Sequence, residues 1–211
     1  MNVINWEYFI KDELNHDKKS SMTVGIFDGV HLGHQALLRK LVLHNKDFTP
    51  VVVTFRDNHK TIKMRNGECE TQNAQLKQCA QLTQCAENSG RKDIQNFQQR
   101  LEMFESFGIQ TVIVIDFCDE FRQIPGSRFL EILFEHGNIG YFAIGGNFRC
   151  GCQLDTDAAA VMNFFTLRNI TAEIMPEVTE GAYPVSSSRI RSAIAEGNIP
   201  LAEKMLGRKY L

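Results

Sequence analysis

The sequence predicts an α/β protein with a doubly wound parallel sheet, on the basis of three observations. Short apolar runs rich in β-branched residues alternate along the chain with segments of helical apolar spacing. Two of these runs lead into glycine-containing turns, at Asp28-Gly29 and at Gly145-Gly146. The 211 residues, of which 43% are hydrophobic, are enough to bury one sizeable core. Such an alternation needs right-handed crossovers, which place helices on both faces of a parallel sheet.

Five apolar runs are expected to form the strands, because they are short, β-branched and bounded by turn residues. They are residues 22–27, 50–55, 111–115, 141–145 and 170–175. Helices are expected at residues 35–43 and 94–107, from a cap at Ser127 to Gly137, from a cap at Asp155 or Thr156 to about Asn169, after the serines at 186–188, and after Pro200. In such sheets a ligand binds at the carboxyl ends of the strands, so the turns that follow the strands are the places to look for a site.

A glutamine-rich insertion interrupts this pattern at about residues 65–99. Glutamine recurs at every third position from Gln72 to Gln84, which fits either a helix with a polar face or a loop. We expect a partly ordered insertion within a single domain that covers residues 1–211.

Composition excludes several classes of function. Lys and Arg number 23 against 25 Asp and Glu, so the chain lacks the excess cations that general nucleic-acid binding needs. No apolar run reaches eighteen residues and the N-terminus does not resemble a signal peptide, so we expect a cytoplasmic protein without a membrane partner. The six cysteines lack the spacing of a zinc site, and we expect free thiols and no protein-bound metal.

The turn after the first strand predicts a phosphate site. Residues 25–34 read GIFDGVHLGH and place His31 and His34 three residues apart where a helix begins. Free backbone N–H groups and the helix dipole favour an anion there, and Gly33 lets a ligand approach closely. Two imidazole donors could stabilise the charge that develops during phosphoryl transfer. The alternatives are a helix cap or a partial metal site, for which Asp28 is the local third ligand.

The last turn carries three hydroxyl groups and two guanidinium groups. Residues 184–191 read PVSSSRIR at a second helix start, where serine hydroxyls and an arginine fork could bind phosphate. A helix cap followed by a solvated basic turn explains these residues equally well when they are taken alone. The pairing with the first turn favours phosphate binding, because a nucleoside triphosphate held between two helix starts needs positive charge from both sides.

Together these motifs resemble the signatures of the nucleotidylyltransferase superfamily and, more closely, the adenylyltransferase domain of bacterial FAD synthetase. The resemblance extends from about Thr23 to Tyr210. It is carried by residues 25–34, 53–55 (VTF), 107–109 (FGI), 145–149 (GGNFR), Gly151, 187–191 (SSRIR), Ala202 and 206–210 (LGRKY). It implies a Rossmann-like fold of the nucleotidylyltransferase type. It also implies transfer of AMP from ATP to FMN with Mg²⁺, which forms FAD and pyrophosphate without a covalent intermediate.

The resemblance also implies roles for residues of the site. His31 and His34 would contact the ATP phosphates and stabilise the transition state, and Asn147 would help to place the phosphates. Ser187, Ser188 and Arg191 would hold the β- and γ-phosphates. The implied catalytic residues are His31, His34, Asn147 and Arg191. The implied ATP-binding residues are Gly25, Phe27, Asp28, Gly33, Ser187 and Ser188. The implied flavin-binding residues are Phe55, His59, Phe148 and Cys150.

The chain departs from the family pattern on the side of the acceptor. The usual D-P-H-P reads Asp57-Asn58-His59-Lys60, and the usual F-R-F-G reads FRCG, with Cys150 in place of an aromatic residue. Two alternatives therefore stay open: transfer to another phosphorylated acceptor, or a flavin- or nucleotide-binding protein without catalysis. No riboflavin kinase domain is expected in these residues, so FMN would come from a separate riboflavin kinase.

Overall fold

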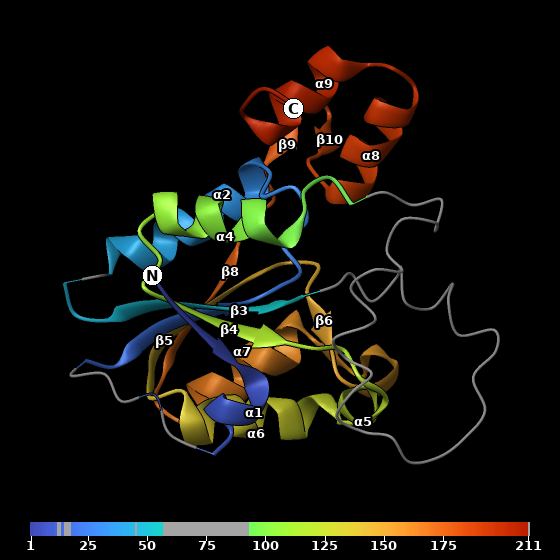
Figure 1. The fold of residues 1–211 in the computed structure, drawn as a ribbon. Coiled ribbons are helices and arrows are strands. Elements are labelled where there is room, and N and C mark those ends of the chain that lie inside the picture. The colour runs from blue at the N-terminus through green and yellow to red at the C-terminus, as the bar shows by residue number, and fades with distance from the viewer. Residues whose placement is uncertain (12–13, 15–17, 45, 57–92, 211) are drawn as a thin grey trace.

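The computed structural model describes residues 1–11, 14, 18–44, 46–56 and 93–210. Its centre is a six-stranded sheet in the order β1-β4-β3-β2-β5-β8, with every neighbouring pair parallel (Figure 1). The strands are β1 (Asn2–Asn5), β2 (Ser20–Val24), β3 (Thr49–Phe55), β4 (Thr111–Ile115), β5 (Ile139–Gly145) and β8 (Thr171–Met175). From β2 the chain continues to β3 and β4 on one side and then to β5 and β8 on the other, so the switch point of the sheet lies between β2 and β5. The predicted doubly wound α/β fold is confirmed.

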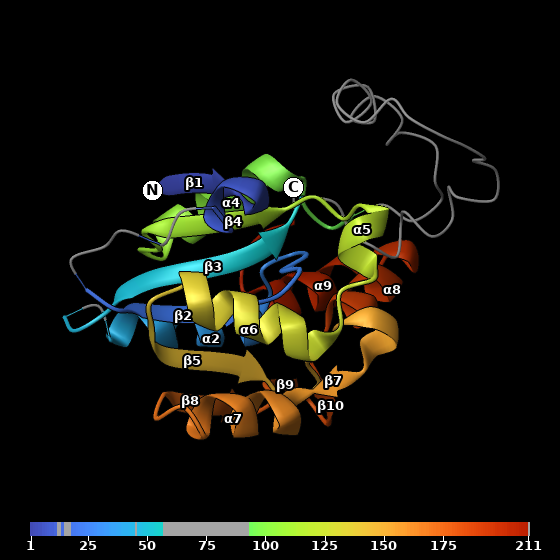
Figure 2. The same ribbon diagram turned by 90° about the horizontal axis from the view of Figure 1, so that it is seen from below.

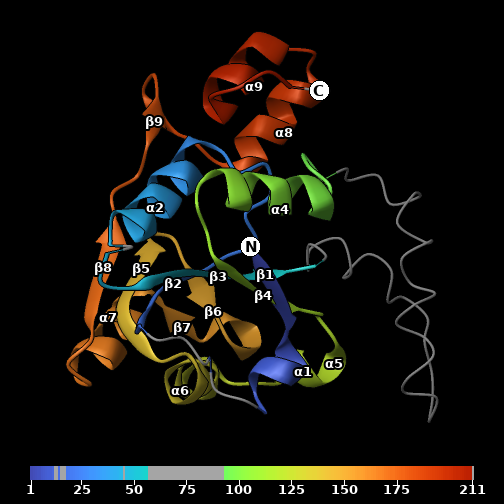
Figure 3. The same ribbon diagram turned by 60° about the vertical axis from the view of Figure 1, so that its left-hand side comes forward.

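Helices cover both faces of the sheet (Figures 2 and 3). One face carries α2 (Leu32–Leu43) and α4 (Phe97–Ser106), and the other carries α1 (Trp6–Phe9), α6 (Gly126–His136) and α7 (Ala158–Thr166). The remaining elements are α5 (Asp119–Arg122), the 3-10 turn η2 (Cys152–Leu154), α8 (Ser187–Ala195), α9 (Ile199–Leu206), and two small antiparallel pairs, β6 (Arg149–Cys150) with β7 (Thr156–Asp157) and β9 (Thr179–Glu180) with β10 (Tyr183–Pro184). No helix among the described residues is long and apolar enough to cross a membrane.

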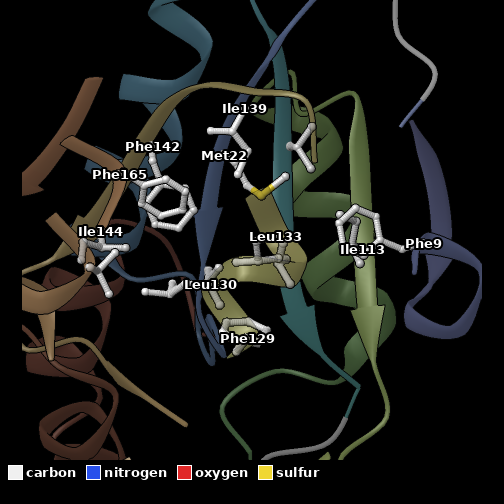
Figure 4. Packing of buried hydrophobic residues seen from close by; sticks show 14 of the residues in the cluster. Phe9, Met22, Ile113, Phe129, Leu130, Leu133, Ile139, Phe142, Ile144 and Phe165 are labelled. Atoms are coloured by element: carbon white, nitrogen blue, oxygen red, sulfur yellow. The ribbon is translucent and has the colours of Figure 1, made fainter. Parts of the chain in front are cut away.

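The central strands β2, β3, β4 and β5 are largely buried because helices pack against both of their faces. In β3, Val51 and Val53 belong to the cluster under α6 and α7, whereas Val52 belongs to the cluster under α2 and α4. Phe142 of β5 stacks on Phe165 of α7 with ring centroids 4.2 Å apart, and Figure 4 shows this pair among the buried side chains. Helices therefore cover both faces of the central strands, and a ligand can reach the sheet only at the ends of the strands.

Several predicted boundaries were wrong, each for a local reason. The first strand ends at Val24, because the chain turns at Phe27 with a φ of +57°. Ser127 caps no helix: α6 begins one residue earlier, after Pro125. Asp157 caps α7 by accepting from the N–H of Ala160 at 2.9 Å, and α7 ends at Thr166, before the predicted Asn169. Asp155 accepts from the N–H of Gly126 at 3.0 Å and so joins two helix starts.

The structure differs from the predicted elements in two further places. The edge strand β1 was not expected from the sequence. Helix α4 begins at Phe97 after a capping box formed by Asn96 and Gln99, not at Ile94 as predicted. Residues 57–92, which hold most of the glutamine-rich insertion with His59, Cys69, Cys79 and Cys85, lie outside the described residues.

Arg100 of α4 ties together the carboxyl ends of β2 and β3. Its side chain donates to the carbonyl oxygens of Ile26 at 2.6 Å, Phe55 at 3.0 Å and Arg56 at 2.6 Å, and the residue is only 3% exposed. A buried cation that satisfies three carbonyl groups fixes the relative positions of the segments that carry them. The chain that leaves β2 and the chain that leaves β3 are thus held in register above the sheet.

Replacing Arg100 should destabilise the fold strongly. Arg100→Met leaves buried carbonyl groups without their charged donor, and we expect the free energy of unfolding to fall by about 3 kcal/mol. Urea denaturation measures this loss. Arg128→Met removes an exposed arginine of α6 and should change stability by less than about 0.5 kcal/mol. Equal stability of the two variants would contradict the assigned role of Arg100.

Candidate active site

A cavity of about 410 Å³ opens at the carboxyl ends of β2, β3 and β5, at the switch point of the sheet. Every site residue named from the sequence that belongs to the described part of the chain lines this cavity. They are Gly25, Phe27, Asp28, His31, Gly33, His34, Phe55, Asn147, Phe148, Cys150, Ser187, Ser188 and Arg191. His59 lies outside the described residues. Turns far apart in the sequence therefore meet at one place.

The first turn adopts its shape through residues in the left-handed region. After β2 the N–H of Gly25 still donates to the carbonyl of Val53 at 3.0 Å, and then Phe27, Gly29 and Val30 all have positive φ, from +36° to +83°. A positive φ is costly for a β-branched residue such as Val30, and strain of this kind is concentrated at functional turns. The chain then enters α2 with His31 as its N-cap.

The two histidines form a stacked pair at the start of α2. Their ring centroids lie 3.6 Å apart, and the backbone N–H of His34 donates to Nδ1 of His31 at 3.4 Å. Gly33 leaves room for this pair, because a Cβ there would lie 3.3 Å from the His31 ring. The Nδ1 atom of His34 is buried and has no hydrogen-bond partner among the described residues. The stacking and the cap orient both rings before any ligand binds.

Both histidines are neutral at neutral pH. Burial lowers the pKa of His31 to about 4, and the charge of Arg208 acts in the same direction. Burial also lowers the pKa of His34 well below its usual value, and His31 adds to this effect. Because Nδ1 of His31 accepts a hydrogen bond, the ring proton of the neutral form is on Nε2. His31 is therefore prepared as a neutral hydrogen-bond donor.

The last turn is joined to the first by Asp28. Ser186 caps α8 by accepting from the N–H of Arg189 at 3.2 Å, and the hydroxyl of Ser187 donates to the backbone oxygen of Asp28 at 2.8 Å. The guanidinium of Arg191 forms an ion pair with the carboxylate of Asp28. Arg191 also lies 3.5 Å from the hydroxyl of Ser188. The start of α8 is thus attached to the turn that precedes α2.

The carboxylate of Asp28 is buried and forms further hydrogen bonds within the protein. Asp28 is 4% exposed, and its carboxylate also accepts from the N–H groups of Ile94 at 2.9 Å and Gln95 at 3.4 Å. Burial raises the pKa of Asp28, and the charge of Arg191 opposes this rise. No group of three His, Cys, Asp or Glu side chains that could hold a metal occurs among the described residues. The carboxylate of Asp28 is thus bound by the guanidinium of Arg191 and by the chain that enters α4.

The other end of the cavity is aromatic. The ring of Phe55 lies 5.7 Å from that of Phe117 and 5.9 Å from that of Phe121. Phe148 and Cys150 line the same end, and burial raises the pKa of the Cys150 thiol to about 12, so this side chain is an uncharged wall at neutral pH. The cavity combines a polar end with an apolar one, as a ligand with phosphate groups and a planar ring requires.

Several residues of the aromatic end were not among the site residues named from the sequence. They are Phe117, Phe121, Ile124, Phe129 and Leu154. Phe117 belongs to the turn after β4, which the sequence marks as a place to look for a ligand because it follows a predicted strand, but no residue of this turn was assigned to the site. The others occur in helices or turns with core-like spacing, and nothing local marks them as residues of a cavity.

Comparison with known proteins finds a matching family model and several similar sequences. The family model described as FAD synthetase matches residues 13–189. A bifunctional riboflavin kinase/FMN adenylyltransferase from Buchnera aphidicola subsp. Schizaphis graminum is 25% identical over 92% of this chain and 56% of its own length. The Bacillus subtilis protein of the same name is 24% identical over 100% of this chain and 59% of its own length. The chain thus spans about half the length of the curated relatives it matches.

Solved structures share the fold. A macrolide-efflux protein from Streptococcus pneumoniae has a TM-score of 0.73 at 24% identity, over 100% of this chain and 72% of that one. Pantoate-beta-alanine ligase from Francisella tularensis has a TM-score of 0.51 at 12% identity, over 98% and 85% of the two chains. At these identities the likeness concerns the arrangement of the sheet and helices alone.

The buried neutral His31 should make stability depend on pH. The unfolded state takes up a proton near the ordinary histidine pKa of about 6.5, whereas the folded state does so only near pH 4. The contribution of His31 to stability is therefore complete above about pH 6.5 and is lost as the pH falls towards about 4. His31→Gln keeps a cap for the N–H of His34 and removes the titration. Urea denaturation measures the free energy of unfolding at about pH 7 and about pH 5. Between these two pH values the free energy of unfolding should fall less for His31→Gln than for the wild-type protein. Equal losses would contradict the assigned protonation state.

Proposed function

Since the chain belongs to the FAD synthetase family, we propose that it transfers AMP from ATP to FMN and releases pyrophosphate. The observation that carries this proposal is a cavity in which two helix starts face the same space as a cluster of phenylalanine rings. The helix starts fit the triphosphate of ATP, and the phenylalanine rings fit the isoalloxazine ring of FMN.

The reaction needs positioning and charge stabilisation more than covalent chemistry. A phosphate oxygen of FMN attacks the α-phosphorus of ATP, the new P–O bond forms, and the bond to pyrophosphate breaks with its electron pair on the leaving group. His31 and His34 donate hydrogen bonds to phosphate oxygens, and the backbone N–H groups at the starts of α2 and α8 add their dipoles. No residue of the chain becomes covalently modified.

The second helix start binds the leaving group. Ser187, Ser188 and Arg191 would hold the β- and γ-phosphates, and Asp28 keeps the guanidinium of Arg191 at the mouth of the cavity. Asn147 would help to orient the phosphates from the end of β5. Mg²⁺ would enter bound to the phosphates of ATP, as it commonly does where a nucleotide supplies most of its ligands.

The acceptor end favours FMN over a phosphopantetheine-like acceptor. Phe55, Phe117 and Phe121 offer ring faces and edges that suit a planar aromatic ligand. Cys150 is smaller than the aromatic residue of the family pattern and leaves more room beside Phe148. FMN would be supplied by a riboflavin kinase, an activity that the names of the bifunctional relatives include.

The direct test is incubation of the protein with ATP, Mg²⁺ and either FMN or riboflavin, followed by chromatographic separation of the flavins. We expect FAD from FMN and none from riboflavin. Consumption of ATP with a different phosphorylated acceptor, and none with FMN, would favour the second candidate reaction. Tight flavin binding without release of pyrophosphate would point to a binding protein.

Removing the phosphate donors should slow the reaction without unfolding the protein. We expect His31→Ala and Arg191→Ala each to lower kcat/KM by roughly 10²-fold or more, because each removes a donor that acts in the transition state. Arg128→Ala, on the exposed face of α6, is the matched control and should leave the rate unchanged. Steady-state assays with FMN measure the effect. Near wild-type rates in both site variants would show that the phosphates bind elsewhere.

A further inference from the structure

Two anions must meet in the proposed reaction, and the cavity offers little uncommitted positive charge for the second one. The phosphate of the acceptor has to approach the α-phosphate of ATP, which repels it. Both histidines are neutral before ligands bind, and the charge of Arg191 is offset by Asp28. A further cation is needed where the acceptor phosphate comes to lie.

Arg149 lines the cavity that also holds the residues proposed for the phosphates and for the flavin ring. It follows Asn147 at the phosphate end and precedes Cys150 at the aromatic end, and all three residues line the cavity. Arg149 belongs to β6, whose pairing with Asp157 of β7 fixes its backbone. An arginine therefore stands in the chain between residues of the phosphate end and of the aromatic end, on the wall of one cavity.

The guanidinium of Arg149 is available for a ligand. Among the described residues it takes part in no hydrogen bond or ion pair, and the residue is exposed. The carboxylate of Asp157, its register partner, is occupied as the cap of α7. Arg122 also lines the cavity, but its guanidinium lies 5.2 Å from the ring of Phe117, at the aromatic end. Arg149 is therefore better placed than Arg122 for the acceptor phosphate.

We propose that Arg149 binds the phosphate of the acceptor and thereby selects FMN over unphosphorylated riboflavin. The planar fork of arginine matches two phosphate oxygens, and its charge offsets the repulsion between the two substrates. This inference rests on the proposed adenylyl transfer to FMN and adds the residue that recognises the nucleophile.

Equilibrium binding of FMN and riboflavin, followed by flavin fluorescence, tests the role of Arg149. We expect Arg149→Met to weaken FMN binding by at least about tenfold and to change riboflavin binding by less than about twofold, because only FMN loses a charged hydrogen bond. Arg149→Lys keeps the charge without the fork and should retain part of the preference for FMN. Arg128→Met, which removes the same charge from the exposed face of α6, should alter neither affinity.

The outcomes separate this inference from the function on which it rests. Suppose that the wild-type protein makes FAD from FMN, but that Arg149→Met weakens the binding of FMN and riboflavin equally or weakens the binding of neither. Arg149 then does not bind the acceptor phosphate, and the proposed function stands. If wild-type protein makes no FAD and binds neither flavin, both proposals are overturned. A variant that loses affinity for FMN alone, while its affinity for ATP stays at the wild-type value, supports the role of Arg149.

Discussion

The ion pair between Asp28 and Arg191 holds the proposed active site together. It joins a turn near the N-terminus to a helix near the C-terminus, and the hydroxyl of Ser187 adds a second link to the same turn. The carboxylate also receives two backbone N–H groups from the entry to α4, so three separate segments converge on one buried side chain. Removing one partner of a buried pair leaves the other uncompensated, so neither residue can change alone without cost.

The central sheet positions the chain segments that lead to this ion pair. Its central strands are buried on both faces, and Arg100 fixes the positions of the chains that leave β2 and β3. The histidines line the cavity as a neutral stacked pair, and among the described lining residues the positive charge comes from arginines. A site built in this way orients an anionic substrate by geometry, and its electrostatic stabilisation can act on charge that forms during the reaction.

The sequence predicted the fold and the phosphate end of the cavity more fully than its aromatic end. Continuous apolar runs identify buried parallel strands, whereas β1 has mostly exposed side chains and carries no such signal. The phosphate residues occur in short local motifs with a mechanism of their own. The partner of Asp28 is 163 residues away, and part of the aromatic wall comes from Phe121 and Phe129, in helices whose spacing indicates only a core. Contacts of that kind depend on how the whole chain folds.

The most direct test of this account is a double-mutant cycle for ATP binding with Asp28→Asn and Arg191→Met, measured by calorimetry. If Asp28 acts by holding Arg191, Asp28→Asn weakens ATP binding in the wild-type background and changes it little once Arg191 is replaced. The coupling energy should then exceed about 1 kcal/mol, as it does for residues in direct contact. Effects that simply add would show that Asp28 and Arg191 act independently on ATP, and would contradict the central place given to this pair.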